Sequence, residues 1–473
     1  MSSRAELRLK PTPLNSSKSP QTPAPPPQHA LHGSPPNHPI PPALTSPPLP
    51  LPSRKTLQSI VLFPFVASST QPRVVVTGAG IVTALGFGWR ANADGFRAGK
   101  TAIRPITLFD VSRQRTKTGA QMDVPETVLP DRILPRDQRR LDRAAKMLLL
   151  AANEAWNQSG WVYGQQNLPL VLGTTSGGMN FGESYYRQAI GAPRSDRGQA
   201  TRVDGYQAQR QALDVTSVFQ FEGPITIIAN ACASGANSIG HAWDLIRRGH
   251  AERVFTGGYD AISQMVFGGF DSLQALSPTV CRPFDAQRNG LALGEGAAML
   301  TIETLDSAKR RNAEILGEIV GYGAATDAHH LTQPHPNGDA ALASMTAACA
   351  AAKVSPNQIN YINAHGTGTP LNDSAEAAAI NRWAGADAKN VPVSSTKASI
   401  GHLLGAAGSV EAVICLMALR EQWLPPMMTL QTPEPTCTFP LVRQPTDAKI
   451  EYALTNSFGF GGANATLVLR RWG

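Results

Sequence analysis

Short apolar segments alternate with helical periodicity along residues 73–473. Seven segments have the length and composition of buried strands: residues 73–77, 170–172, 225–228, 253–255, 298–302, 361–362 and 465–469. Longer stretches with helical periodicity separate them, chiefly residues 139–156, 234–248, 340–352 and 406–420. We therefore expect an α/β fold with buried, parallel or mixed sheets, and there are too many strand–helix units for one simple sheet.

Two glycine-containing stretches fail as nucleotide sites. We expect the first predicted strand to end in a glycine turn at Gly78. This turn is not a dinucleotide site, because no acidic residue follows at the spacing needed to bind the ribose. Residues 95–101 have three residues between their glycines where a phosphate loop has four. The cluster of Asp327 with three nearby histidines lies beside a proline-rich loop, so we predict no metal there.

Composition separates the first 72 residues from the rest. They hold 18 of the 38 prolines, one of the 42 glycines and +5 of the net charge of +8. We expect residues 1–72 to be a disordered, proline-rich leader, because such a segment buries too little apolar surface to offset its ordering entropy. A transit peptide is the alternative, which would make the location organellar rather than cytoplasmic.

The remaining chain is nearly neutral, which argues against nucleic acid as a partner. The longest apolar run of the leader, residues 60–67, contains Pro64 and is too short to span a bilayer. The five cysteines lie at least 22 residues apart with no CxxC pair, so we expect neither a disulfide framework nor a structural zinc.

Cys232 stands out because it follows the predicted strand 225–228 and precedes the predicted helix 234–248. The positive end of a helix dipole lowers the pKa of a thiol and favours the reactive thiolate. Its neighbours are small, so a substrate carbonyl could approach the backbone closely. A buried structural cysteine is the alternative interpretation.

Two histidines support the catalytic interpretation. His365 follows a predicted strand and begins a glycine turn, and His402 precedes the glycine-rich start of a predicted helix. Histidines at strand ends flanked by glycine are more often exposed to a cleft than buried in a core. A further glycine-rich turn, NSFGFGGAN, precedes the last predicted strand.

These residues lie in motifs of one known family. Cys232 lies in ACASG, His365 in NAHGTGTPLND, Lys397 and His402 in SSTKASIGHLLGAAG, and NSFGFGGAN closes the series. In this order the motifs resemble the beta-ketoacyl-acyl carrier protein synthases of type II. The resemblance implies a thiolase-like fold of two similar halves in an α-β-α-β-α arrangement, with the nucleophile in residues 73–310 and the two histidines in residues 311–473.

The resemblance also implies a reaction. Cys232 would take an acyl chain from acyl carrier protein as a thioester, and the backbone N–H groups of Cys232 and Phe460 would form the oxyanion hole. His365 and His402 would hydrogen-bond the malonyl thioester oxygen while decarboxylation forms an enolate. The enolate carbon would then attack the acyl-Cys232 thioester. This is a decarboxylative Claisen condensation, an acyltransferase reaction that elongates the chain by two carbons.

Other residues have supporting roles by the same resemblance. Lys397, with Glu376 as its ion-pair partner, would orient the histidines. Thr367 and Thr369 would bind the phosphopantetheine arm that the substrates carry, so no separate cofactor is implied. Phe460 would gate the acyl pocket, and Phe458 belongs to the same motif.

The implied partners are an acidic acyl carrier protein and a second subunit, in a homodimer or a heterodimer. Arg136, Arg139 and Arg140 resemble the docking segment of the family, although a solvated helix start would look similar.

Residues 179–219 depart from the usual pattern of the family, so acyl chain length stays open. Fatty-acid elongation and a polyketide or polyene pathway are both compatible with the sequence. A catalytically silent partner subunit is the rival interpretation, but it would be expected to lack the nucleophile.

Overall fold

The computed structural model describes residues 71–191 and 199–473, so the predicted leader lies outside the described residues except for its last two positions. The main sheet has the strand order β11-β10-β14-β15-β9-β1-β8-β7-β5-β6, and the short β2 pairs with β1. The strands of the first half are β1 (Val74–Thr83), β5 (Leu170–Gly173), β6 (Ile225–Ile228), β7 (Arg253–Asp260) and β8 (Gly296–Thr304). Those of the second half are β9 (Gly317–Thr326), β10 (Tyr361–Asn363), β11 (Val393–Ser394), β14 (Tyr452–Phe458) and β15 (Ala463–Arg470).

The two halves repeat one strand order. In each half the third strand along the chain lies at the edge, followed by the second, fourth, fifth and first. The second strand is parallel to its neighbours in both halves, and the fifth is antiparallel to its neighbours. The halves join where β1 pairs with β9 over three residues of each strand.

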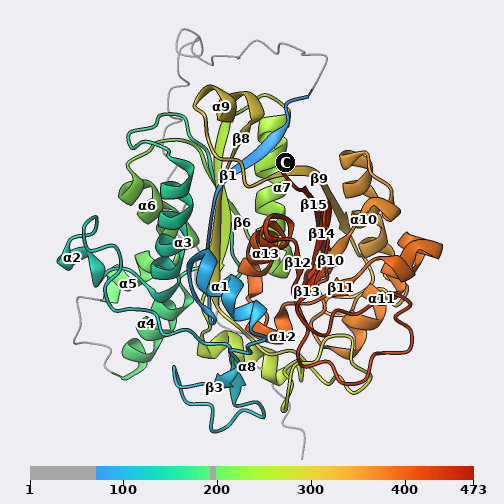
Figure 1. Ribbon diagram of the computed structural model, residues 1–473. Helices are drawn as coiled ribbons and strands as arrows, with labels where there is room; N and C mark the ends of the chain where they lie inside the picture. Colours follow the sequence, from blue (N-terminus) through green and yellow to red (C-terminus); the bar gives the residue numbers. More distant parts are fainter. Residues whose placement is uncertain (1–70, 192–198) are drawn as a thin grey trace, which may run out of the picture. The chain divides into compact units, whose positions relative to one another are not determined.

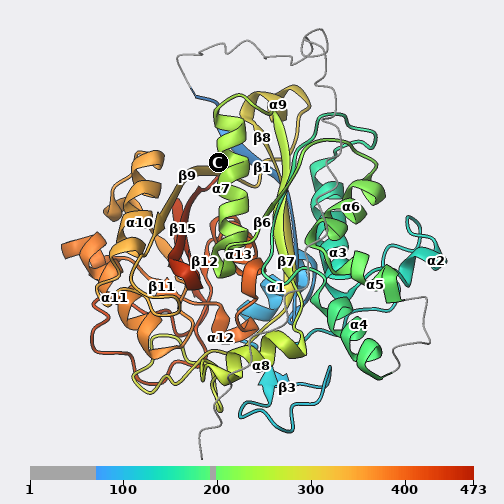
Figure 2. The ribbon, with the colours of Figure 1, turned by 180° about the vertical axis from the view of Figure 1, so that it is seen from behind.

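Helices cover both faces of each half-sheet (Figures 1 and 2). α3 and α6 lie outside the first half, α10 and α11 lie outside the second, and α7 and α13 lie between the two. The predicted α-β-α-β-α arrangement is therefore confirmed. The helices are α3 (Arg143–Ser159), α6 (Ala208–Phe219), α7 (Ser234–Arg247), α10 (Asp339–Ala352), α11 (Pro370–Ala384) and α13 (Ala407–Glu421).

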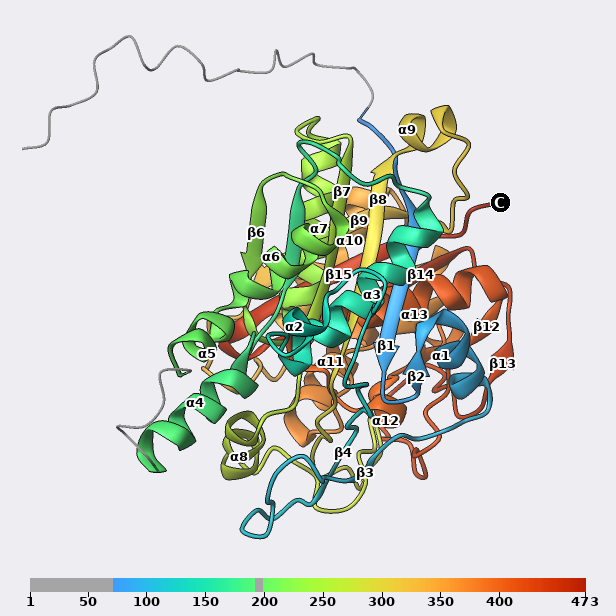
Figure 3. The same ribbon diagram turned by 90° about the vertical axis from the view of Figure 1, so that its left-hand side faces the viewer.

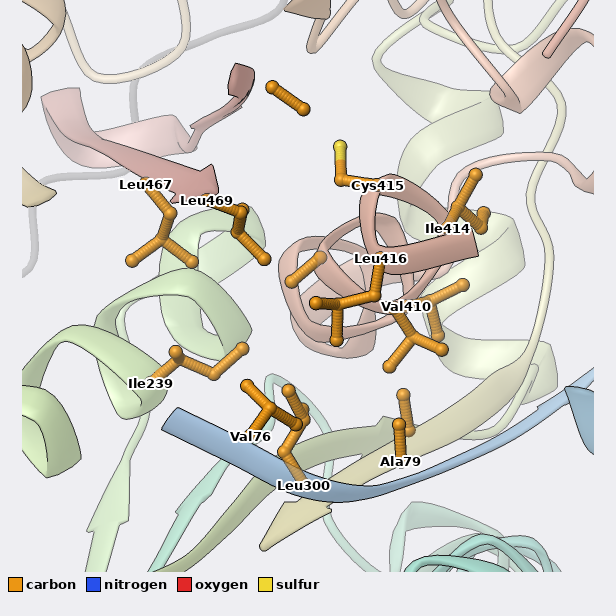
Figure 4. Close-up of a cluster of buried hydrophobic side chains, with 14 of the residues drawn as sticks. Val76, Ala79, Ile239, Leu300, Val410, Ile414, Cys415, Leu416, Leu467 and Leu469 are labelled. Carbon is orange, nitrogen blue, oxygen red and sulfur yellow. The ribbon is translucent and has the colours of Figure 1, made fainter. Parts of the chain in front are cut away.

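The middle layer forms the main core. Every residue of α13 from Ala407 to Leu419 is buried, so this helix has no polar outer face. Figure 4 shows strand side chains of both half-sheets meeting those of the two middle helices. The labelled residues are Val76, Ala79, Leu300, Leu467 and Leu469 from the strands, and Ile239, Val410, Ile414, Cys415 and Leu416 from the helices.

The expected turn at Gly78 is wrong, because β1 continues through it to Thr83 with a bulge between Val76 and Gly78. The glycines here serve close packing instead of a turn. A Cβ at Gly78 would lie 2.1 Å from the carbonyl oxygen of Ala155, and one at Gly80 would lie 1.9 Å from that of Ala151. Glycine is therefore required because the backbone of α3 touches this strand.

Helix positions were predicted well except at one start. The predicted helix 139–156 begins later, at Arg143, because Asp142 caps it by accepting a hydrogen bond from the N–H of Ala145 (2.6 Å). A separate short helix, α2 (Pro135–Gln138), precedes it. The main-sheet strands β9, β11 and β14 were not predicted, nor was the short β2.

The remaining elements are short or lie at the periphery. Within 179–219, residues 179–191 and 199–219 contain α4 (Met179–Gly191), α5 (Gln199–Tyr206) and α6, on the side of the edge strand β6 (Figure 3). The others are β2 (Gly86–Phe87), α1 (Gly88–Arg97), β3 (Arg104–Pro105), β4 (Thr118–Gly119), α8 (Gln264–Ser272), α9 (Leu305–Arg310), α12 (Lys397–Ile400), β12 (Trp423–Leu424) and β13 (Thr446–Asp447), with 3-10 turns η1 (Ala231–Ala233), η2 (Pro356–Gln358), η3 (Gly385–Asn390), η4 (Leu404–Ala406) and η5 (Phe460–Gly462). Within the described ranges, no helix is both long and apolar enough to cross a bilayer.

The contact between β1 and α3 gives a stability prediction. Gly80→Ala should lower the free energy of unfolding by about 1–3 kcal/mol or more, because the new methyl group overlaps a backbone carbonyl. Gly269→Ala in α8 is the matched control, since a Cβ there meets nothing within 4 Å. Urea unfolding of both variants tests this, and equal stabilities would contradict the close packing.

Candidate active site

One pocket of about 360 Å³ brings together most of the predicted site residues. The predicted residues that line it are Cys232, His365, Thr367, Thr369, His402, Phe458 and Phe460. They come from loops that follow strands of both halves, so the pocket draws on both half-sheets. Lys397 and Glu376 are buried and do not line it.

Cys232 lies in η1, between β6 and α7. Its side chain is buried, and the residue before it, Ala231, has a left-handed φ of +56°. Hydrogen bonding from the backbone N–H groups of Cys232 and Phe460 lowers the pKa of this thiol, so both groups lie near the sulfur. A thioester carbonyl bound at this sulfur would therefore meet the two predicted oxyanion donors.

The expected low pKa of Cys232 is wrong. Burial raises the pKa of the Cys232 thiol to about 12, although the Lys397 charge and the two N–H groups lower it. Desolvation outweighs the helix start, because the charged form loses its water at this depth. Burial also raises the pKa values of Cys281, Cys349 and Cys437 to about 12, so access to the pocket, and not acidity, distinguishes Cys232 from them.

The loop of His365 is held by two carboxylates of α11. Glu376 accepts hydrogen bonds from the backbone N–H groups of His365 (2.8 Å) and Gly366 (2.7 Å). Asp373 accepts from the N–H groups of Thr367 (3.0 Å) and Gly368 (3.1 Å). Both carboxylates are buried, and their hydrogen bonds to the backbone N–H groups hold this loop in place.

His402 lies between α12 and η4, and its backbone bonds with the stretch before β8. Its N–H donates to the carbonyl oxygen of Ala292 (2.7 Å), and its own carbonyl accepts from Gly294 (2.9 Å). Its ring Nδ1 accepts a hydrogen bond from the backbone N–H of Leu404 (3.1 Å). Because Nδ1 accepts, the proton of the neutral ring is on Nε2, which makes Nε2 a donor.

The two imidazoles lie side by side, with ring centroids 5.3 Å apart and planes at 87°. Burial lowers the pKa of each well below the ordinary value, and the Lys397 charge lowers both further. Both rings are therefore neutral at pH 7 and each can donate one hydrogen bond. Phe458 packs against His365 with centroids 5.6 Å apart.

The expected ion pair between Lys397 and Glu376 is wrong. The Lys397 ammonium instead pairs with Glu411 of α13, and both side chains are almost fully buried. Glu376 is occupied by the backbone of the His365 loop and by the side-chain amide of Asn456 (3.1 Å). A lone glutamate inside the apolar stretch 406–420 was the available signal for the true partner of Lys397.

Phe460 lies in a glycine-rich turn at the pocket mouth. Its ring is 36% exposed and stacks on Phe270 of α8, with centroids 5.8 Å apart. Gly461 and Gly462 both have left-handed φ values, which glycine adopts without steric strain. Thr367 and Thr369 lie on another wall, where their hydroxyls are 2.8 Å apart.

Arg136, Arg139 and Arg140 lie away from this site, whereas Asp327 and His330, from the cluster predicted to hold no metal, line the pocket. Arg136, Arg139 and Arg140 are exposed on and just after α2, and none of them lines the pocket. The carboxylate of Asp327 accepts hydrogen bonds from the backbone N–H groups of His329 (3.2 Å) and His335 (2.6 Å). Among the residues with assigned positions, no group of three or more His, Cys, Asp or Glu side chains is arranged to hold a metal ion.

Comparisons with known proteins agree with this fold. The profile described as "Beta-ketoacyl synthase, N-terminal domain" matches residues 71–308, and "Beta-ketoacyl synthase, C-terminal domain" matches residues 316–431. A 3-oxoacyl-[acyl-carrier-protein] synthase 2 from Synechocystis sp. is 36% identical over 420 residues, covering 86% of this chain and 100% of the relative. The chain belongs to the beta-ketoacyl synthase family.

Solved structures of ketosynthases show the same fold. The ishigamide ketosynthase/chain length factor superposes with a TM-score of 0.78 at 32% identity, covering 85% of this chain and 100% of that one. A type II polyketide ketosynthase in complex with its acyl-carrier protein has a TM-score of 0.76 at 25% identity, with the same coverage.

The pKa of Cys232 predicts how its alkylation depends on pH. Because the thiol is protonated at neutral pH, the rate of iodoacetamide modification should rise about tenfold per pH unit from pH 7 to 9. Cys232→Ser gives the background from the other cysteines, and peptide mass spectrometry assigns the label. A plateau below pH 8 would mean that the helix start dominates over burial.

Proposed function

We propose that this protein catalyses the decarboxylative condensation of malonyl-acyl carrier protein with an acyl chain held on Cys232. The main support for the proposal is that one pocket is lined by both a buried thiol and two neutral histidines. Cys232, His365 and His402 are all present, which argues against a catalytically silent partner subunit. The family assignment supports the same reaction.

In the first half-reaction the Cys232 sulfur attacks the thioester carbonyl of an acyl carrier protein. The sulfur–carbon bond forms as the bond to the phosphopantetheine thiol breaks, and the proton of Cys232 ends on that leaving thiol. The N–H groups at the Cys232 sulfur stabilise the tetrahedral oxyanion. Burial makes the neutral thiol the resting form, so proton removal accompanies the attack.

In the second half-reaction the malonyl thioester loses carbon dioxide. The electron pair of the breaking bond passes to the thioester oxygen, which becomes an enolate oxygen within reach of donors. The Nε2–H of His402 is one such donor, and His365 supplies the other. Neutral donors stabilise this charge without giving a full proton to the carbanion. The carbanion then attacks the carbonyl carbon of acyl-Cys232. The carbon–carbon bond forms as the bond to the Cys232 sulfur breaks, and the departing thiolate takes up a proton to restore the resting thiol.

The relatives indicate the metabolic pathway less directly than they indicate the reaction. Fatty-acid elongation is our first assignment, because the curated relatives are 3-oxoacyl-[acyl-carrier-protein] synthases at 35–36% identity. A polyketide or polyene pathway is the second, because the solved ishigamide ketosynthase is 32% identical. Assays with carrier proteins loaded with saturated and polyene chains would distinguish the two.

Acyl carrier protein and a second subunit are the proposed partners. Arg136, Arg139 and Arg140 are exposed and basic, as a docking surface for an acidic protein requires. The strand β6 ends the sheet order, and its residue Ile225 is 37% exposed, so its free edge is available to a second chain. We propose a homodimer through this edge, with a heterodimer as the alternative.

Replacing single residues should separate the two half-reactions. Cys232→Gln removes the nucleophile but leaves the histidines, so condensation should vanish while decarboxylation of malonyl-acyl carrier protein persists. His365→Ala or His402→Ala should slow decarboxylation by about 10²-fold, the usual scale for losing one oxyanion donor. Carbon dioxide release and intact mass measure the two steps. Loss of decarboxylation in folded Cys232→Gln would refute the assigned roles.

The position of Phe460 predicts a gate whose loss changes acylation more than stability. Phe460→Ala should alter the rate or chain-length preference of Cys232 acylation with little loss of stability, because the ring is partly exposed on a glycine turn. Phe458→Ala is the matched comparison, and should cost about 3–5 kcal/mol because that ring is buried. Thermal unfolding and intact mass measure both effects. Strong destabilisation with unchanged acylation in Phe460→Ala would show a packing role.

A further inference from the structure

Asp260 is a buried carboxylate at the end of β7 that has no part in the reaction described above. It does not line the pocket. Its two oxygens nevertheless accept five hydrogen bonds from both halves of the chain. The donors are Thr174 Oγ1 (2.8 Å), Thr175 N–H (2.8 Å), Ser176 N–H (2.9 Å), Ser176 Oγ (2.8 Å) and Gly405 N–H (2.6 Å).

One of these bonds holds the turn that orients His402. Gly405 donates to Asp260, and the residue before it, Leu404, donates its N–H to His402 Nδ1. Leu404 has a left-handed φ of +53°, which a side chain of this size adopts only where its surroundings impose it. The bond from Gly405 to Asp260 therefore holds the peptide unit next to the one whose N–H sets which nitrogen of His402 carries the proton, and the two units share the Cα of Leu404.

A second bond connects Asp260 to the turn of Cys232. Thr175 donates its N–H to Asp260, and its hydroxyl donates to the carbonyl oxygen of Ala231 (3.2 Å). Ala231 precedes Cys232 and also has a left-handed φ. One carboxylate thus reaches the strained turns on both sides of the pocket, directly for His402 and through one side chain for Cys232.

We propose that Asp260 is a positioning residue that holds the His402 turn in register with Cys232 and thereby keeps the proton of His402 on Nε2. The inference deepens the proposed function, since it rests on His402 as an enolate donor. It predicts that loss of the carboxylate affects the decarboxylation half-reaction more than acylation, because only the His402 turn is bonded to Asp260 directly.

Two substitutions at this position should behave differently. Asp260→Ala leaves the N–H of Gly405 without its acceptor, so the turn can relax. Asp260→Asn can keep its carbonyl oxygen toward Gly405 and Thr175 and turn its amide toward the hydroxyls of Thr174 and Ser176, which can rotate to accept. Only the backbone N–H of Ser176 then loses its acceptor. Recovery in the Asn variant is therefore expected if the acceptor for Gly405 is what matters.

The test measures decarboxylation of malonyl-acyl carrier protein and acylation of Cys232 on the same full-length variants. Asp260→Ala should lower kcat for decarboxylation by about tenfold to a hundredfold, the scale of a small misplacement of a reacting group. KM should change little, acylation should fall less than about threefold, and Asp260→Asn should recover part of the lost rate. Equal losses in the two steps, or no recovery in Asp260→Asn, would overturn the proposal.

A control and a second variant exclude general unfolding. Glu303→Ala removes another fully buried carboxylate, at the far end of β8, and should lower stability without changing the ratio of the two rates. If Asp260→Ala does not fold, Gly405→Ala tests the same contact, since its Cβ would lie 2.7 Å from Asp260 Oδ2 and 2.5 Å from Thr175 N. It should reproduce the selective loss of decarboxylation, and an unchanged ratio of rates would overturn the proposal.

The tautomer of His402 is a readout that does not depend on activity. With ¹⁵N-labelled histidine, and the His402 signal assigned from His402→Ala, NMR should show the proton on Nε2 in the unmodified protein and a mixture in Asp260→Ala. An unchanged tautomer in the folded variant would overturn the proposal. If the unmodified protein shows the Nε2 proton but releases no carbon dioxide, the proposed function fails and the role of Asp260 in orienting the ring does not.

Discussion

The site depends on the contact between the starts of α7 and α13, where backbone touches backbone. A Cβ at Gly235 would lie 2.7 Å from the carbonyl oxygen of Gly405, and one at Gly408 would lie 2.6 Å from the nitrogen of Ala236. Because no side chains separate these helix starts, the turns before them lie close together as well. Cys232 and His402 are in those turns, so the width of one glycine contact sets the spacing of the proposed nucleophile and the proposed enolate donor.

Burial in this middle layer also determines the charge state of the site. The same desolvation that raises the pKa of the Cys232 thiol lowers the pKa values of His365 and His402. All three groups are therefore neutral at rest, and charge appears only on the reacting substrate. In surroundings of low dielectric constant a fixed hydrogen-bond donor stabilises such transient charge more strongly than it would in water. The Lys397 ammonium, paired with Glu411, lowers the pKa of all three groups as well.

Much of the fold could be predicted because hydrophobic periodicity is local. The helices at 234–248, 340–352 and 406–420 appear within one residue of their predicted ends. β9 was missed because Gly321 and Gly323 interrupt its apolar pattern, and both pack against the backbone of α10. The turn expected at Gly78 was wrong for the same reason. A glycine needed for packing against a distant helix and a glycine needed for a turn look alike in sequence.

The site residues themselves could be named from motifs, but their pairings could not. Whether Lys397 pairs with Glu376 or Glu411 depends on which helix end faces it, and the spacing of residues does not show this. The prediction of a low pKa for Cys232 was wrong for a related reason. A helix start is visible in sequence, whereas the depth at which it is buried is a property of the whole assembly of layers.

The repeated strand order has a consequence for how such a site can arise. Cys232 follows the third strand of its half, β6, and His402 follows the third strand of the other half, β11, so the two residues occupy equivalent loops. Two identical halves would have to carry the same residue at both positions. Joined in one chain, each copy of the loop can specialise, so that one supplies the proposed nucleophile and the other supplies the proposed hydrogen-bond donor to the enolate oxygen.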